Sequence, residues 1–386
     1  TEIYTLSLHD ALPIYSSFFC KKYKIKNIYQ IGAGMVGSAM AADLSKNHNL
    51  FLADYDVTIL EKIQSKNPNI QISQLDVTDQ ESLSEWIAPA DIVLLAVPGF
   101  LGYNALKTII KAGKDVVDIS FSPENVLNLN SLAKERGATV IVDAGVAPGI
   151  PNYLLGFWDA QLNIESFEYY VGGLPKNPQP PFNYKAPFSP IDVIEEYIRP
   201  ARMLIDHEVI TEPALSDIET MEFEDAGTLE AFNTDGLRSL LSTMNHIPNL
   251  KEKTLRFPGH AKLMLDYRNQ GLFDKSNIDK TSKKLFQEWK LEENEIEFTV
   301  LDIIIKGEMK MITYHLYDEF DLSSRTSSMA RTTGYTATAS VNLILDNLYN
   351  KYGVFPPEIV GANSNCMQFI LEYLRQRNVI ISEKTT

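Results

Sequence analysis

Three glycines in the segment YQIGAGMVGSAM have a spacing that can hold a phosphate group. They follow an apolar run and precede an alanine-rich stretch, so they mark a turn from a strand into a helix. The first glycine allows the sharp bend, the second lets backbone amides approach a diphosphate, and the third allows close packing of helix on strand. The helix N-terminus adds unpaired N–H groups and partial positive charge. Although such a turn can serve packing alone, we predict dinucleotide contacts at Gly32, Ala33, Gly34, Met35, Val36 and Gly37.

Asp54 closes the second predicted strand about 20 residues after this turn, where the dinucleotide fingerprint has an acidic residue. A carboxylate there accepts hydrogen bonds from ribose hydroxyls and repels a 2′-phosphate, which predicts NAD rather than NADP as the cofactor. Asp76 ends the third strand, where adenine would lie, but together with Thr78 it equally describes a helix cap. The remaining cofactor contacts are predicted at strand ends, at Asp76, Val77, Ala96, Val97 and Pro98.

Two carboxylates, Asp118 and Asp143, end the fifth and sixth predicted strands. Because ligands of open parallel sheets bind beyond the carboxyl ends of the strands, both are predicted catalytic groups that orient a cationic substrate or act as a base. Capping of the following helices is nearly as good an explanation. Tyr184 and Lys185, in a proline-rich loop, are further predicted catalytic groups, as base or proton relay. A packing tyrosine and a solvated lysine are the alternative for that pair.

The elements that must position these groups begin with a regular alternation. Six short β-rich runs alternate with amphipathic stretches between Lys26 and Gly149. This pattern predicts a parallel sheet covered by helices on both faces, which is a doubly wound (Rossmann) α/β fold. Two of its helices are expected at 38–46 and 103–112, and a further helix is expected to start at Pro148.

The pattern changes after Gly149, where proline-dense and β-rich stretches predict a second, mixed α+β domain. Two long strands joined through Gly307 and a helix over 336–350 are expected in this part of the chain. The expected division is a leader at 1–24, an NAD-binding domain at 25–148, a substrate and oligomerisation domain at 149–325, and C-terminal helices at 326–386 that return to the first domain.

Composition excludes several classes of function. The chain has 386 residues and a formal net charge of −15, so a nucleic acid partner is not expected. Two cysteines, Cys20 and Cys366, are too few for a disulfide framework and fit a reducing, cytoplasmic setting. The six histidines lack ligand spacing for zinc, so no metal is expected. Apolar runs are strand-length, which predicts no membrane span.

The first residues, TEIYTLSLHDALPI, are treated apart from the fold. They contain no basic stretch followed by an apolar core, so a signal peptide is not expected here. They resemble the translation of a sequencing-adapter oligonucleotide, and we expect the natural protein to start between about Tyr15 and Lys24. A genuine leader sequence is the alternative.

A set of motifs along the chain resembles the lysine 6-dehydrogenases, within the wider saccharopine dehydrogenase-like family. The likeness runs from about Asn27 to Lys384. It implies oxidation of the ε-amine of L-lysine with NAD to 2-aminoadipate 6-semialdehyde, which cyclises to a piperideine carboxylate. It also implies a dimer-based homo-oligomer. The motifs, in chain order, are VDAGVAPG, YVGGLP, PPFNY, FSP, GTLEAFNTDG, PNLKEKTLRFPGHA, MARTTGYT, GVFPPEIV and VIISEK.

One departure bears on the choice of substrate within the family. Saccharopine-forming members usually follow Pro-Gly with a hydrophobic residue and then Asp-His, whereas here Pro151 and Asn152 follow Ile150. This departure and Asp54 disfavour the NADP-using, saccharopine-forming relatives. Two alternatives stay open: an enzyme for another amine such as saccharopine or a carboxylated polyamine, and a nucleotide-binding protein without turnover.

The implied reaction needs a neutral amine and an anchor for the distant carboxylate. The ε-amine of free lysine has a pKa of about 10.4, so a base or an apolar pocket must remove its proton. A bidentate arginine is the preferred carboxylate anchor. Thr234 and Asp235 are predicted to bind the α-amino group, although Asp235 with Gly236 also describes a turn, and His260 is interpreted as structural. The arginines considered are Arg199, Arg202, Arg238 and Arg256, of which the resemblance favours Arg238 and Arg256.

Overall fold

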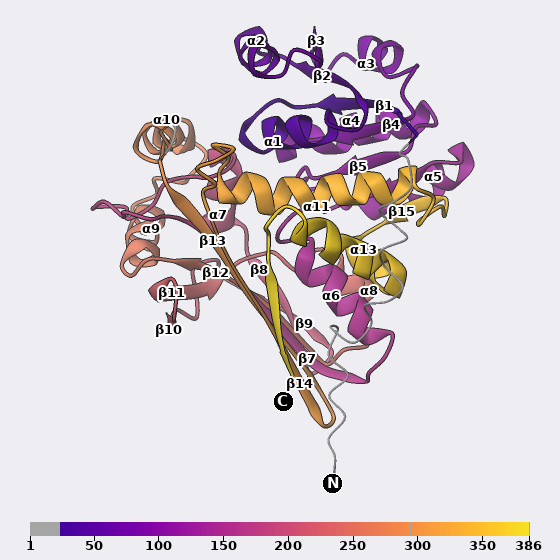
Figure 1. Cartoon of the computed structure of the whole chain (residues 1–386). Coiled ribbons are helices and arrows are strands. Elements are labelled where there is room, and N and C mark those ends of the chain that lie inside the picture. Colours follow the sequence, from indigo (N-terminus) through magenta and orange to yellow (C-terminus); the bar gives the residue numbers. More distant parts are fainter. Residues whose placement is uncertain (1–23, 293–294, 386) are drawn as a thin grey trace.

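The computed structural model describes residues 24–292 and 295–385. Apart from Lys24, the predicted leader lies outside these residues. Figure 1 shows two β-sheets with a long helix, α11 (Ser328–Leu345), running between them. α11 contacts α1 (Met35–Leu44) in the first half of the chain and β13 (Glu297–Gly307) in the second. The two sheets are therefore held together by a helix from the C-terminal part of the chain.

The first sheet is parallel throughout. Within the described residues it has seven strands in the order β15-β6-β5-β4-β1-β2-β3. Its β4, with the sequence IVLL, is buried at every position, as expected for a strand covered on both faces. The predicted doubly wound α/β fold is confirmed. The strands are β1 (Asn27–Ile31), β2 (Asn49–Asp54), β3 (Gln71–Gln74), β4 (Ile92–Leu95), β5 (Val116–Asp118), β6 (Thr139–Ile141) and β15 (Gly353–Phe355).

Local signals start the helices of this half. The side chains of Asp56 and Asp79 accept backbone N–H bonds at the first turns of α2 and α3. The helices predicted at 38–46 and 103–112 both begin about one turn earlier than expected, directly after Gly34 and Pro98. The helical segments are α1, α2 (Val57–Lys66), α3 (Gln80–Trp86), α4 (Gly99–Lys111), the 3-10 turn η3 (Val126–Leu129), α5 (Asn130–Arg136) and α6 (Ile150–Asp159).

The second half of the chain contains both strands and helices, as predicted, and its sheet combines parallel and antiparallel strands. Across the described chain this sheet has nine strands, with the path β10-β11-β12-β7-β13-β14-β16 and the pair β8–β9 attached to β12. β7 runs parallel to β12 and antiparallel to β13. The predicted strand pair around Gly307 is confirmed as the β13–β14 hairpin. The strands are β7 (Ile164–Pro175), β8 (Ala201–Ile205), β9 (Glu208–Glu212), β10 (Glu219–Phe223), β11 (Gly227–Asn233), β12 (Asn249–Arg256), β13, β14 (Lys310–Glu319) and β16 (Ile381–Thr385).

The C-terminal segment 326–385 contributes to both sheets. β15 adds to the edge of β6 in the first sheet, whereas β16 pairs with β14 in the second. The helix predicted over 336–350 is α11; it starts earlier because Ser327 caps it, and Gly334 packs on Met40 of α1 without breaking it. The other helices are α7 (Pro190–Ile198), α8 (Leu240–Thr243), α9 (His260–Asn269), α10 (Ile278–Glu288), α12 (Pro357–Gly361) and α13 (Ser364–Arg375).

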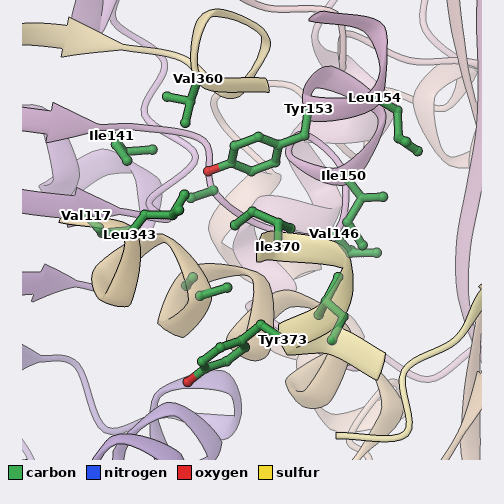
Figure 2. Close-up of a cluster of buried hydrophobic side chains, with 14 of the residues drawn as sticks. Val117, Ile141, Val146, Ile150, Tyr153, Leu154, Leu343, Val360, Ile370 and Tyr373 are labelled. Atoms are coloured by element: carbon green, nitrogen blue, oxygen red, sulfur yellow. The ribbon is translucent and has the colours of Figure 1, made fainter. Parts of the chain in front are cut away.

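A buried cluster fills the space where the first sheet meets α6, α11 and α13 (Figure 2). Tyr153 of α6 lies within it, fully buried, with its hydroxyl 2.7 Å from Ser340 Oγ on α11. Val117 and Ile141 reach the same cluster from β5 and β6. Burial of this apolar surface fixes α11 beneath the first sheet.

A buried carboxylate adds a polar connection to this packing. Asp43 of α1 accepts hydrogen bonds from Thr338 Oγ1 and the Tyr373 hydroxyl, both at 2.8 Å. The Nε of Arg377 lies 2.9 Å from both oxygens of the same carboxylate. Because the Asp43 side chain is almost fully buried, loss of a partner leaves a buried charge without compensation. The helix that starts at the glycine turn is thus bound to the C-terminal part of the chain.

Candidate active site

A cleft of about 1000 Å³ lies between the carboxyl ends of the first sheet and the second half of the molecule. The glycine turn and the ends of β2 and β4 form one wall. Side chains from β7, β12 and α7 form the opposite wall, and Met329 and Thr333 of α11 close it from a third direction. The cleft is therefore built from both sheets and from the helix that joins them.

The glycine turn fits a dinucleotide. A Cβ on Gly32, whose φ is +104°, would come within 2.2 Å of Ala96 O, and a Cβ on Gly37 within 2.3 Å of Gly32 O. Gly34 differs, because a Cβ there would meet no described atom within 4 Å and would project into open space. No side chain among the described residues caps the N-terminus of α1, which leaves its first N–H groups for a ligand. The turn is a cradle that a larger residue at position 34 would fill.

Asp54 braces this turn at the end of β2. Its Oδ2 accepts a hydrogen bond from Ala33 N at 2.7 Å, and its Oδ1 accepts one from Asp56 N at 2.9 Å. The carboxylate lines the cleft, whereas Ala33 is buried behind it and does not. The other residues predicted to bind the cofactor also line the cleft, at Gly32, Gly34, Met35, Val36, Gly37, Asp76, Val77, Ala96, Val97 and Pro98.

Asp76 and Thr78 form a local turn beside the predicted adenine position. The Oδ1 of Asp76 accepts hydrogen bonds from the Thr78 backbone N at 2.9 Å and from its hydroxyl at 2.7 Å. Both residues line the cleft. The cap of α3 is the next residue, Asp79, which accepts from Glu81 N and Ser82 N. The helix-cap interpretation of Thr78 is therefore wrong, because Asp79 holds that position.

Asp143 is the predicted catalytic carboxylate that lines the cleft. The Nε of Arg238 lies 3.1 and 3.0 Å from its two oxygens, and the Nη1 of Arg238 donates to Ser122 O at 3.0 Å. Arg238 itself is not part of the cleft wall; its guanidinium lies 4.4 Å from the centre of the Phe121 ring. The structure thus places Arg238, a predicted carboxylate anchor, behind Asp143 as its partner.

The other three predicted catalytic residues do not line the cleft. Asp118 is buried, its Oδ1 accepts from Ser120 N at 2.8 Å and Ser120 Oγ at 2.6 Å, and burial raises the pKa of its carboxyl to about 7. The ammonium group of Lys185 donates to Glu288 O at 3.1 Å. Tyr184 is buried under Arg256, with its ring 4.4 Å from the guanidinium carbon. The alternative of a packing residue fits Tyr184. Helix capping does not fit Asp118, because Asn125 caps the next helical segment, η3, and Lys185 is partly buried.

The cleft wall formed by β12 contains Arg256 and Glu252. The Nη2 of Arg256 contacts Glu196 Oε2 on α7 at 2.6 Å. Glu252 is almost fully buried and accepts from Thr234 Oγ1 at 2.8 Å and from Gly236 N at 2.9 Å. Burial raises the pKa of the Glu252 carboxyl to about 8. This side of the cleft therefore presents a paired cation and a carboxyl that titrates near neutral pH.

Residues 28–141 match the family described as "Saccharopine dehydrogenase NADP binding domain", and residues 145–380 match "Saccharopine dehydrogenase C-terminal domain". The second match alone covers more than half of the chain. The chain belongs to the saccharopine dehydrogenase family. The family predicted from the motifs is confirmed, while the narrower likeness to lysine 6-dehydrogenases stays a prediction.

Individual relatives agree with this family. The mitochondrial alpha-aminoadipic semialdehyde synthase of Mus musculus is 25% identical over 265 residues, which are 65% of this chain and 29% of the mouse protein. The NADP(+), L-glutamate-forming saccharopine dehydrogenase of Saccharomyces cerevisiae is 29% identical over 173 residues, 42% of this chain and 39% of the yeast protein. The chain thus spans less than half the length of these relatives. The solved yeast saccharopine dehydrogenase superposes with a TM-score of 0.76 at 20% identity, covering 94% of this chain and 100% of that one, which shows a shared fold.

Several residues in the cleft of this saccharopine dehydrogenase family member were missed by sequence reasoning. They are Asp192, Glu195 and Glu196 of α7 and Glu252 of β12, two elements that were not predicted, whereas Arg199 and Arg256 were among the arginines considered from the sequence. The segment PIDVIEEYIR places Asp192, Glu195, Glu196 and Arg199 at helical spacing on one face, which was a readable signal. In the strand KEKTLR, Glu252, Lys253 and Arg256 are all buried. Buried charges in a β-rich run indicate partners or function, and this signal was also available.

The wall of the cleft contains more carboxyl side chains than arginine side chains. Thr234 and Asp235, the predicted amino-group ligands, both line it, and Asp235 accepts two hydrogen bonds of 2.9 Å from Arg202. Among the described residues, the cations of the wall are Arg199 and Arg256. The carboxylates facing them on the substrate side are Asp143, Asp192, Glu195, Glu196, Asp235 and Glu252. Four of these carboxyl groups are paired with arginines: Asp143 with Arg238, Asp235 with Arg202, Glu195 with Arg199 and Glu196 with Arg256.

Two further observations concern metals and membranes. Within residues 24–292 and 295–385, no three His, Cys, Asp or Glu side chains are grouped closely enough to hold a metal ion. In the same residues, no helix combines the length and the apolar character that crossing a lipid bilayer requires.

Proposed function

We propose that this family member oxidises the ε-amine of L-lysine with NAD. The product is 2-aminoadipate 6-semialdehyde, which cyclises to piperideine-6-carboxylate. The observation that carries the proposal is the composition of the cleft. A glycine turn suited to a dinucleotide forms one end, and the buried Arg256, paired with the partly exposed Glu196, lies with Glu252 on the opposite wall. A bound nicotinamide ring supplies the hydride acceptor.

The pair Arg256–Glu196 matches the head of an α-amino acid. Such a head carries a carboxylate and an ammonium group on one carbon atom. Arg256 Nη2 and Glu196 Oε2 lie 2.6 Å apart, and both residues line the cleft, so one head group can contact a cation and an anion together. The Thr234 hydroxyl lies in the same wall but is bonded to Glu252 at 2.8 Å, and Asp235 is the next residue. An amino acid bound at this head extends its side chain toward the rest of the cleft.

Glu252 is the group we assign to remove the proton of the substrate ammonium. Transfer from an amine with a pKa near 10.4 to an ordinary glutamate near 4.3 is uphill by about 8 kcal/mol. A carboxyl that titrates at about 8 reduces this cost to about 3 kcal/mol. The nitrogen lone pair then forms the C=N bond as the C6–H bond breaks with its electron pair. Water replaces the nitrogen of the resulting iminium ion, which releases ammonia and leaves the aldehyde.

NAD is the cofactor we propose, although the matched family is described as an NADP binding domain. Asp54 lies in the cleft where it would meet the adenosine ribose, and a 2′-phosphate would be repelled there. Both cations found in the described wall, Arg199 and Arg256, come from the second half of the molecule. The adenosine end therefore offers a carboxylate to the ribose and no arginine or lysine from its described wall to a phosphate.

The test is NADH formation at alkaline pH with L-lysine, saccharopine, ornithine, cadaverine and alanine. Lysine-dependent absorbance together with trapping of a cyclic imine by o-aminobenzaldehyde supports the proposal. Turnover with saccharopine alone would contradict it. Binding of NAD without turnover of any amine would instead support a nucleotide-binding protein.

Oxidation of saccharopine is the second candidate, and one observation favours it. Arg199 gives the cleft a second cation besides Arg256, and saccharopine carries more carboxylates than lysine does. The yeast relative is named as a saccharopine dehydrogenase. Both of these cations already have a carboxylate partner, Glu195 for Arg199 and Glu196 for Arg256, which weighs against this candidate.

A further inference from the structure

We propose that Tyr197 and His260 are positioning residues that aim the Arg256 guanidinium at the α-carboxylate of the substrate. This inference rests on the amino-acid substrate proposed above. Neither Tyr197 nor His260 lines the cleft, so both act through Arg256. All three side chains are buried.

A chain of hydrogen bonds connects the three residues to the backbone. The Nε of Arg256 donates to the Tyr197 hydroxyl at 3.2 Å, this hydroxyl lies 2.9 Å from His260 Nε2, and His260 Nδ1 lies 2.7 Å from Phe182 O. A carbonyl oxygen only accepts, so Nδ1 carries the hydrogen and, in a neutral imidazole, Nε2 is the acceptor. Tyr197 therefore donates to His260 and accepts from Arg256. The donor and the acceptor of each of these three hydrogen bonds are thus fixed.

The surroundings keep His260 in this state. Burial and the neighbouring Arg256 lower the pKa of the imidazole to about 3, so the ring stays neutral throughout the working pH range. The rings of Tyr184, Tyr197 and Trp289 pack around it, with centroids 5.0, 5.6 and 6.2 Å away. Because the ring stays neutral and is packed between aromatic side chains, Nε2 of His260 remains a hydrogen-bond acceptor in a fixed position.

The remaining contacts of Arg256 complete the alignment. Besides its bond to Tyr197, its Nη1 donates to Leu255 O at 2.9 Å and its Nη2 to Glu196 at 2.6 Å. Among the described residues, protein acceptors thus bind three of the five guanidinium N–H groups. One N–H group on each terminal nitrogen is left for a ligand. A preset guanidinium loses little conformational freedom on binding, so alignment translates into affinity for a carboxylate.

The experiment compares L-lysine with cadaverine, which has the same chain and both amines but no carboxylate. Tyr197→Phe removes the hydroxyl and keeps the ring. We expect it to raise KM for lysine about tenfold, as loss of a hydrogen bond to a charged group does, with kcat changed less than about threefold. The inhibition constant of cadaverine against lysine is expected to stay unchanged. An equal weakening of both ligands, or of neither, would overturn the proposal.

His260 provides a second, independent variant. Gln places its amide oxygen near the position of Nε2, so His260→Gln is expected to keep KM for lysine close to the wild-type value, whereas His260→Leu raises it as Tyr197→Phe does. Tyr153→Phe is the matched control, because it removes a buried hydroxyl that is bonded to Ser340 and belongs to a different buried cluster from Tyr197. Failure of Gln to restore binding in a folded variant would contradict an acceptor role.

The inference can be separated from the proposed reaction. Wild-type protein that forms no NADH with lysine refutes the reaction, and calorimetric affinities for lysine and cadaverine in the presence of NAD then replace KM. A lysine affinity that falls about tenfold in Tyr197→Phe, with cadaverine unaffected, still supports the alignment of Arg256. Absence of lysine binding by the wild type overturns both.

Discussion

The two ends of the cleft are built in different ways. The central feature of the cofactor end is one contiguous stretch, residues 32–37, in which missing side chains open the backbone to a ligand. The substrate end is assembled from side chains on α7, β12 and the turn after β11, which are distant in sequence. Spacing in a sequence records backbone geometry directly. It does not show which side chains from separate elements meet, because the fold decides this.

The largest effect is expected at the substrate end, on the kcat of a Glu252 variant. Glu252→Gln removes the proposed base and should lower kcat for lysine about 10²- to 10⁴-fold. Because the pKa of Glu252 is raised to about 8, the carboxyl is protonated and inactive below that pH. The wild-type kcat/KM should therefore rise as pH increases through about 8, and the variant should lose this rise.

Glu297 provides a matched control for that variant. It is a buried carboxyl whose pKa burial also raises to about 8, but it binds Ser328 N and Met329 N at the start of α11 and does not line the cleft. Glu297→Gln is expected to keep the wild-type dependence of kcat/KM on pH. If Glu252→Gln retained full activity, Asp143 would become the preferred base, to be examined with Asp143→Asn.

At the cofactor end, two glycine variants are expected to separate binding from folding. Gly34→Ala places a methyl group in the open cradle and should weaken NAD binding about tenfold or more without loss of thermal stability. Gly32→Ala must be destabilising, because its Cβ would lie 2.2 Å from Ala96 O in a backbone of φ +104°. Fluorescence titration with NADH and thermal denaturation measure the two effects. Normal NADH affinity in Gly34→Ala would count against the cradle.

The cofactor preference should change by a similar or smaller factor. Asp54→Ala is expected to lower the ratio of NAD to NADP affinity about tenfold, because it removes both the ribose acceptor and the repulsion of a 2′-phosphate. The neighbouring Asp56, which caps α2 through Thr58 N, is the control, since Asp56→Ala leaves the cleft wall intact. A ratio that did not change in Asp54→Ala would remove the argument for NAD.

The smallest expected effect concerns stability. The pKa of Asp118 is raised to about 7 by burial, so its favourable contribution is present below about pH 4 and is lost as the pH rises through 7. Asp118→Asn avoids this loss. Its melting temperature relative to wild type should increase by a few degrees between pH 5 and 8. A pH-independent difference would show that the Asp118 carboxyl titrates normally.

The sequence predicted the first sheet and the cofactor end well, because their determinants are local. Alternating strands and helices gave the doubly wound fold, and the glycine spacing identified the residues from Gly32 to Gly37 that line the cleft, apart from Ala33. β15 was missed because it lies in the C-terminal part of the chain, outside the alternating pattern between Lys26 and Gly149 from which the other strands of this sheet were predicted. The sequence also could not show that Arg238 would pair with Asp143, 95 positions away. Long-range pairing of this kind is set by packing.

The attachment of α1 to the C-terminal part of the chain has a consequence for synthesis on the ribosome. Asp43 receives Arg377 across 334 positions, and the first sheet completes its edge only when β15 is available. N-terminal domains commonly fold as they emerge. Here the nucleotide-binding half must wait, with Asp43 and the edge of β6 uncovered, until nearly all of the chain has been translated. A nascent chain stalled before residue 353 should therefore display this half in an incomplete, protease-sensitive form.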